Sequence, residues 1–199
     1  MSARRVLVVI GPSASGKSSV VRELHRRRVI RVLPTWTTRP RRADERGGSV
    51  EHRFVSDERF DDLCAQGFFL ETGALPGSAL PYRYGLPRLP PELPPGGPVD
   101  AVIVRAGFVQ RTARRFPRQV VYQIEDTAER ARLRLLLRGC PPAEQATRLD
   151  GHRGEIEAGR RVADRVIVND RPLADLVDAV AVAIRDDLFA PTFRGGLAS

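Results

Sequence analysis

Cysteine is scarce in this chain, and its placement argues against both disulfide bonds and a Cys/His metal site. The 199 residues include only two cysteines, Cys64 and Cys140, without a Cys/His spacing of the metal-binding type. This usage fits a reducing compartment without disulfides, so we expect a cytoplasmic protein. The apolar run at residues 6–10 is too short for a secretion signal or a membrane span. We therefore expect no membrane partner.

Aromatic residues are also few, at 6% of the chain, although the formal net charge is +9. A basic surface attracts nucleic acid, but RNA-binding segments interleave aromatic with basic residues, and no such segment is present. The arginines run from Arg4 to Arg194 without forming a basic tail. Clustered arginines bind a small phosphorylated molecule equally well. We therefore expect a small phosphorylated acceptor as partner and no nucleic acid.

Lysine is the rarest cation of all. Of the 33 lysine and arginine residues, 32 are arginines and one, Lys17, is a lysine. Arginine is thus used wherever else a cation is needed. A phosphate-cradling loop requires a compact, flexible ammonium group, because a planar guanidinium does not fit inside a tight backbone nest. This single lysine indicates a phosphate site.

Lys17 lies in the motif GPSASGKS, which follows a β-branched strand at residues 5–10 and precedes a helical segment at residues 17–28. Strand, G-x-x-x-x-G-K-S and helix in this order are typical of an ATP phosphate loop. Its backbone N–H groups and the helix end hold the phosphates, and the Ser18 hydroxyl is the predicted Mg²⁺ ligand. The predicted ATP-binding residues are Gly11, Ser13, Ala14, Ser15, Gly16, Lys17, Ser18 and Ser19.

Strand and helix signals alternate along the rest of the chain, which predicts an α/β fold with three layers and a mainly parallel sheet. The proline-rich segment at residues 86–98 is expected to form a stiff connector. Ser56 is the predicted N-cap of one helix, and Asp126 with Glu129 that of another. Further strands are expected at residues 29–33, 100–104, 119–124 and 165–168. Residues 35–86 are polar and rich in turn residues, with short apolar stretches at 52–55 and 68–70. Further helices are expected at residues 57–66, 126–139, 142–163 and 172–184.

The order of short motifs resembles the guanylate kinase family across nearly the whole chain. After the phosphate loop come TTRPRR (37–42), HRFVS (52–56), FFLE (68–71), YG (84–85), LLLRG (135–139), TRL (147–149) and VIVND (166–170). The resemblance implies a P-loop kinase fold that forms one domain over residues 1–199. In it, a core (1–34 and 99–190) carries a small acceptor-binding insertion (about 35–98) and a short lid (about 134–150).

The resemblance also implies roles for individual residues in phosphoryl transfer from ATP to GMP, with Mg²⁺ as cofactor. Phosphoryl transfer depends on positioning and charge stabilisation, so arginines, a lysine and a metal ion suffice. Glu71 is expected to accept hydrogen bonds from the ring N–H and amino group of guanine, and Asn169 to lie near the adenine of ATP. The expected acceptor-binding residues are Thr35, Arg39, Arg42, His52, Glu71 and Tyr84. The expected catalytic residues are Lys17, Arg134, Arg138 and Arg148.

The chain departs from the family pattern at the acceptor end. Leu86 replaces a hydroxyl residue that helps to read guanine, Val102 and Val104 replace acidic residues, and His52 replaces a phosphate-binding tyrosine. Because polar partners of the base are lost, we expect GMP to be accepted poorly and with modest selectivity over AMP. Ribose 1,5-bisphosphate kinases, which need no base pocket, are an alternative, and so is a catalytically inactive binding module. The oligomeric state and the carboxylate that assists Mg²⁺ stay open.

Overall fold

The central sheet is parallel, as the sequence predicts. The computed structural model describes residues 5–41, 45, 48–74, 82–88, 90–91, 94 and 96–189. The sheet has the strand order β2 (Ile30–Val32), β7 (Val99–Ile103), β1 (Arg5–Ile10), β8 (Arg118–Glu125) and β9 (Arg165–Val168). All of its strand pairs are parallel. The β-branched run of β1 occupies the centre, where its last five side chains are at most 2% exposed.

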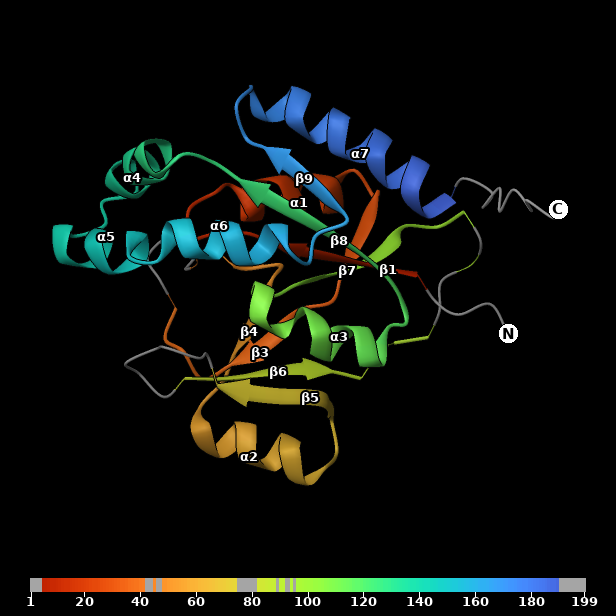
Figure 1. Ribbon diagram of the computed structural model, residues 1–199. Coiled ribbons are helices and arrows are strands. Elements are labelled where there is room, and N and C mark those ends of the chain that lie inside the picture. The colour runs from red at the N-terminus through yellow and green to blue at the C-terminus, as the bar shows by residue number, and fades with distance from the viewer. Residues whose placement is uncertain are drawn as a thin grey trace, which may run out of the picture.

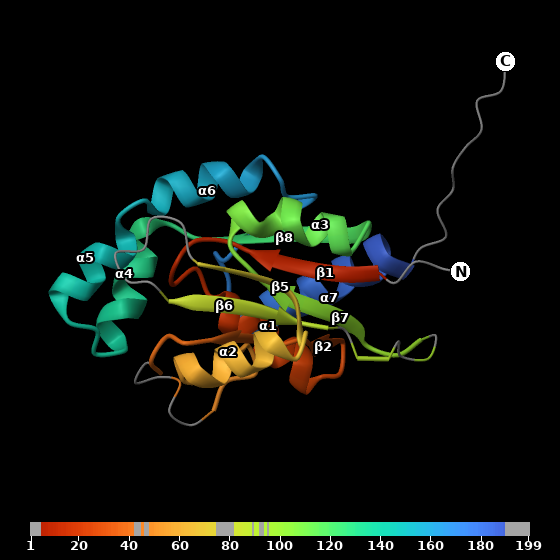
Figure 2. The same ribbon diagram turned by 90° about the horizontal axis from the view of Figure 1, so that it is seen from below.

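Helices cover both faces of this sheet, which gives the three layers expected for an α/β fold (Figure 2). On one face, α1 (Lys17–Arg26) and α7 (Leu173–Phe189) pack over a core that includes Leu7, Leu24 and Ile184. On the other face lie α3 (Val109–Arg115) and α6 (His152–Arg160), beside a second core that includes Val8 and Phe116. The predicted fold class is confirmed.

A second, smaller sheet projects from the first and carries α2 (Asp57–Ala65) on its outer side (Figure 1). Its strand order is β4 (His52–Phe54), β3 (Thr35–Thr37), β6 (Arg83–Pro87) and β5 (Phe69–Ala74). The Phe60 ring of α2 stacks on Phe69 of β5 with 4.7 Å between ring centroids. The Ser56 hydroxyl accepts from the Arg59 backbone N–H, so the predicted N-cap is confirmed. Strands β3 and β6 were not predicted, because β3 has only three residues and β6 contains a glycine and a proline, which are uncommon in strands.

The extent of one predicted helix and the N-cap of another are wrong. The single helix expected at residues 142–163 is two helices, α5 (Pro142–Leu149) and α6, because Gly151 adopts the left-handed conformation with φ +73° and interrupts the helical path. Helix α4 (Ala128–Leu137) is capped by Thr127 rather than Asp126, since the Thr127 hydroxyl accepts from the Arg130 N–H at 3.2 Å.

Helix α3 and the 3-10 helix η2 (Ala106–Phe108) that precedes it were not predicted at all. The chain between β7 and β8 lacks a strong apolar period, and tertiary packing against the sheet decides its structure. Among the described residues, no helix has both the length and the apolar character needed to cross a membrane.

Candidate active site

The phosphate loop joins the end of β1 to the start of α1 and needs glycine at both ends. Gly11 has φ +140°, and a Cβ there would lie 2.0 Å from the backbone oxygen of Ile124 on β8. Gly16 has φ +96°, and its Cβ would lie 2.2 Å from Nδ2 of Asn169. The Asn169 amide donates to the backbone oxygen of Ser15 at 2.9 Å. Close packing against β8 and Asn169 therefore holds the loop in shape.

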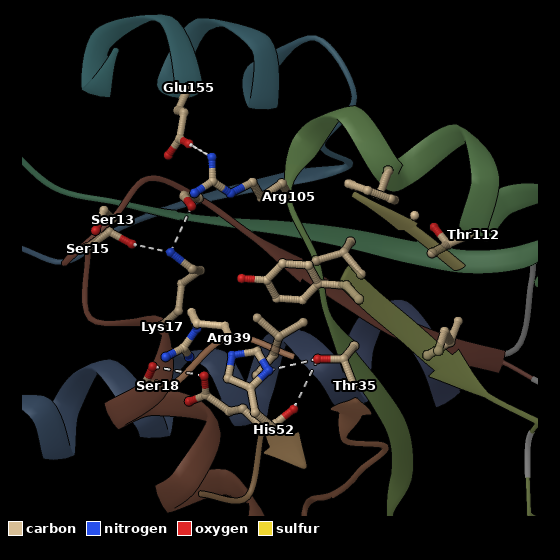
Figure 3. A pocket seen from close by; sticks show the side chains of 18 of the residues that line it. Ser13, Ser15, Lys17, Ser18, Thr35, Arg39, His52, Arg105, Thr112 and Glu155 are labelled. Carbon is tan, nitrogen blue, oxygen red and sulfur yellow. Dashed lines mark hydrogen bonds and ion pairs between the residues drawn. The ribbon is translucent and has the colours of Figure 1, made fainter. Parts of the chain in front are cut away.

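The Lys17 ammonium group lies inside this loop. Its Nζ donates to the backbone oxygens of Gly11 at 2.7 Å and Pro12 at 2.5 Å, and lies 3.4 Å from the Ser15 hydroxyl (Figure 3). These oxygens belong to the loop itself, so the loop backbone holds the ammonium charge in its centre.

Ser18 lies in the first turn of α1, and its hydroxyl contacts a carboxylate from the segment before β4. Its hydroxyl donates to Oε2 of Glu51, the residue before β4, at 3.0 Å. Burial raises the pKa of the Glu51 carboxyl above its ordinary value, although the Ser18 hydrogen bond and the charges of Lys17 and Arg22 act in the opposite direction. The Ser18 hydroxyl oxygen and the Glu51 carboxylate oxygen, both of the ligand type that Mg²⁺ prefers, thus lie side by side next to the phosphate loop.

One cavity of about 210 Å³ joins the phosphate loop, the second sheet, helix α3 and the lid segment. Its lining includes most of the residues that the sequence singles out: Gly11, Ser13, Ala14, Ser15, Gly16, Lys17, Ser18, Thr35, Arg39, His52, Glu71, Tyr84, Arg138 and Arg148. Three others are described but do not line it: Ser19, Arg134 and Asn169. Arg42 lies outside the described residues.

The second sheet places a cluster of phosphate-binding side-chain types at the mouth of the loop (Figure 3). The Thr35 hydroxyl lies 2.8 Å from Nδ1 of His52, and β3 and β4 bring the two residues directly opposite one another. The buried Arg39 guanidinium donates to both Glu45 carboxylate oxygens at 2.8 and 2.7 Å. Burial works against its charge, but Glu45 and Tyr84 outweigh burial and raise the pKa of Arg39. Arg39 is therefore a fixed cation that faces the cavity.

The end of the cavity beside β5 combines one carboxylate with an apolar wall. Glu71 lies 3.8 Å from Nη1 of Arg111 and 3.6 Å from Nη2 of Arg115, both on α3. Leu86 is buried and lines the cavity, as does Val104. Val102 is fully buried in the core of the parallel sheet.

The lid arginines differ in their contacts. Arg138 ends α4 and Arg148 lies on α5, where it pairs with Glu144, and both line the cavity. Arg134 instead donates to the backbone oxygen of Ala14 at 2.9 Å and to the Asp126 carboxylate. The structure thus gives Arg134 a contact that the sequence did not predict, a support of the phosphate-loop backbone.

Several residues that line the cavity were not predicted from the sequence. Arg105 and Glu155 line the cavity and form a hydrogen-bonded ion pair at 3.0 Å (Figure 3). Arg105 follows the carboxyl end of β7, which is where α/β sheets bind ligands, so its position was a usable signal. Phe108, Arg111 and Thr112 gave no such signal, because they lie on the unpredicted η2 and α3.

Comparisons with known proteins agree with one another. Residues 3–82 match the family described as guanylate kinase. The guanylate kinase of Symbiobacterium thermophilum is 35% identical over 180 residues, which cover 88% of this chain and 81% of that protein. The guanylate kinase of Mycobacterium leprae is 35% identical over 189 residues, which cover 90% and 87%. The guanylate kinase of Thermobifida fusca is 46% identical over 88 residues, a match that spans 42% of that protein.

The fold points to the same family. The crystal structure of guanylate kinase from Anaplasma phagocytophilum superposes with a TM-score of 0.66 at 23% identity, covering 95% of this chain and 88% of that one. At this identity the superposition shows the shared fold, whereas the relatives above, at 35% identity over most of their length, show the family. The chain belongs to the guanylate kinase family of ATP-dependent nucleoside monophosphate kinases.

Proposed function

We propose that the chain transfers the γ-phosphoryl group of ATP to GMP, giving ADP and GDP. One observation carries this proposal: a single cavity is lined by Lys17 of the phosphate loop, by Arg138 and Arg148 of the lid, and by the carboxylate Glu71. A donor-phosphate site, charge-stabilising groups and an acceptor for guanine N–H groups are what this reaction needs.

At the donor end, the loop backbone and the start of α1 bind the ATP phosphates, and Lys17 exchanges its loop oxygens for phosphate oxygens. Ser18 and Glu51 are the residues that would hold Mg²⁺. They fit the ion because their oxygens already converge at 3.0 Å, and because Mg²⁺ is normally bound by one or two carboxylates together with substrate phosphates. The described residues contain no cluster of three or more metal-binding side chains, so the remaining ligands would be phosphate oxygens and water. When bound, the ion neutralises charge between the phosphates.

At the acceptor end, Arg39 binds the GMP phosphate, with Tyr84, Thr35 and His52 beside it. The phosphate competes with Glu45 for the Arg39 guanidinium, so acceptor binding releases that carboxylate. Arg42 is proposed for the same phosphate from the family resemblance alone. Glu71 accepts from N1–H and the amino group of guanine.

In the transfer step, an oxygen of the GMP phosphate bonds to the γ-phosphorus of ATP while the bond to the bridging oxygen of ADP breaks. Arg138 and Arg148 stabilise the charge on the group in flight, and no covalent enzyme intermediate is needed. Arg134 acts indirectly, because it holds the loop through Ala14. Asn169 holds the loop through Ser15, and its place near adenine stays a prediction.

The test compares steady-state ADP release with GMP, dGMP, AMP and ribose 1,5-bisphosphate as acceptors. We expect turnover with the guanine nucleotides. Robust turnover of the sugar bisphosphate with none of GMP would overturn the proposal, and no turnover with any acceptor would favour a binding module. The cytoplasmic location inferred from cysteine usage stays a prediction, and both cysteines are free thiols.

A further inference from the structure

Helix α3 forms one wall of the base pocket. Neither the sequence nor the proposed mechanism assigns a role to the residues of this wall. Phe108, Arg111 and Thr112 line the cavity together with Glu71 and Gly73 of β5. In Figure 3, α3 borders the cavity on the side opposite the phosphate loop, with Thr112 labelled on it. A cationic side chain therefore shares the base pocket with the carboxylate expected to read guanine.

The Arg111 guanidinium is held in place from several sides. Its Cζ lies 5.3 Å from the centroid of the Phe108 ring, a cation–π distance. Its Nη1 lies 3.8 Å from Oε1 of Glu71. A Cβ on Gly73 would come within 3.0 Å of Arg111 Nη1 and 3.1 Å of Phe108 Cε1, so only glycine leaves both groups ordinary room. The arginine and the carboxylate thus form a paired donor and acceptor at the end of the cavity.

This pairing matches the edge of guanine. Guanine presents two donors, N1–H and the 2-amino group, next to the acceptor O6, with N7 beyond it. A carboxylate suits the donors, and a guanidinium suits O6 and N7, which is the commonest specific contact between arginine and this base. Adenine places an acceptor at N1 and a donor at N6, so it meets the pair with both polarities reversed. The Leu86 side chain offers no hydrogen bond to the base, so Glu71 and Arg111 are the charged groups that can read it at this end of the cavity.

We propose that Arg111 is a specificity-determining residue that donates hydrogen bonds to O6 and N7 of the acceptor guanine, beside Glu71. The inference rests on the proposed function. From Leu86 alone, which replaces a hydroxyl residue, only a modest preference for GMP over AMP is expected. With Arg111 as a second group that reads guanine, we expect a larger preference.

Arg115 provides a matched control. It lies on the same helix, its Nη2 is 3.6 Å from Oε2 of the same Glu71, and its side chain is 48% exposed, against 50% for Arg111. Unlike Arg111, it does not line the cavity. A change at Arg115 therefore removes a similar ion pair with Glu71 without removing a donor from the pocket.

The experiment measures kcat/KM for GMP, IMP and AMP in the wild type, Arg111→Met, Arg111→Lys and Arg115→Met. We expect Arg111→Met to lower kcat/KM about 10- to 100-fold for GMP and for IMP, which shares O6 and N7, and to leave AMP unchanged or improved. Arg111→Lys restores only part of the GMP rate, because an ammonium cannot bridge O6 and N7. Arg115→Met changes the GMP:AMP ratio less than about threefold, as expected for an exposed ion pair.

The outcomes separate this inference from the proposed function. The KM for ATP and the melting temperature of each variant report whether it is folded. If the wild type phosphorylates GMP but Arg111→Met leaves the GMP:AMP ratio unchanged, or if Arg115→Met lowers it equally, the role of Arg111 is refuted while the kinase activity stands. If the wild type phosphorylates no guanine nucleotide, the proposed function itself fails.

Discussion

Replacing the only lysine by arginine tests the phosphate site most directly. In the structure the Lys17 Nζ has two backbone oxygens at 2.7 and 2.5 Å and a hydroxyl at 3.4 Å. A guanidinium is longer and planar, so Lys17→Arg cannot place its charge among the same oxygens. Losing one charge-assisted hydrogen bond costs about 1.5–3 kcal/mol, and a misplacement of about 1 Å costs about 100-fold in rate. We expect kcat to fall about 100-fold, equivalent to about 2.7 kcal/mol of barrier.

The assay is steady-state ADP release with saturating GMP, together with a thermal melt. Arg26→Lys is the control, because that arginine is exposed and pairs with Glu23 one turn away on α1. The control is expected to keep the wild-type kcat and melting temperature. Lys17→Ala is expected to abolish turnover. A Lys17→Arg variant that turns over at nearly the wild-type rate would refute the phosphate site described here.

Three further predictions test the metal site, the lid and the fold. Glu51→Gln should raise the Mg²⁺ concentration for half-maximal binding of a fluorescent ATP analogue about tenfold, and an unchanged midpoint would remove Glu51 from the metal site. Arg138→Ala and Arg148→Ala should each lower kcat at least about tenfold with little change in ATP affinity, whereas lost ATP affinity with normal kcat would make them ground-state binders. The buried Tyr122 hydroxyl donates to the Asp187 carboxylate at 2.6 Å. Asp187→Ala leaves this hydroxyl without an acceptor and should destabilise the fold by about 1–3 kcal/mol. Adding Tyr122→Phe should recover most of that loss in thermal melts. Arg165 and Tyr122 lower the pKa of Asp187 in the folded protein. The loss of folding stability caused by Asp187→Ala should therefore be complete at pH values above the ordinary carboxyl pKa. It should shrink as the pH falls through the lowered pKa of Asp187, where the wild-type carboxylate becomes protonated.

The sequence alone determined the parts of this protein in which local rules and burial agree. The β-branched run of β1 predicted a buried strand, and the spacing of Gly11, Gly16 and Lys17 predicted the loop that follows it, in which both glycines have a positive φ. The central strands, helix α1 and the Ser56 cap followed from the same local signals. Family motifs then supplied seven further residues that line the cavity: Thr35, Arg39, His52, Glu71, Tyr84, Arg138 and Arg148.

Tertiary structure decided the features that depend on contacts between distant segments. Helix α3 has little helical period of its own, and packing against the sheet both orders it and brings Arg111 within ion-pair distance of Glu71 on β5. The Ser18–Glu51 hydrogen bond spans 33 positions in the sequence and exists only because β4 folds back over the phosphate loop. Arg134 reaches Ala14 across 120 positions because the fold places α4 beside the phosphate loop. Local sequence patterns carry no information about such distances, because a side chain's role in a site depends on which other segment the fold places opposite it.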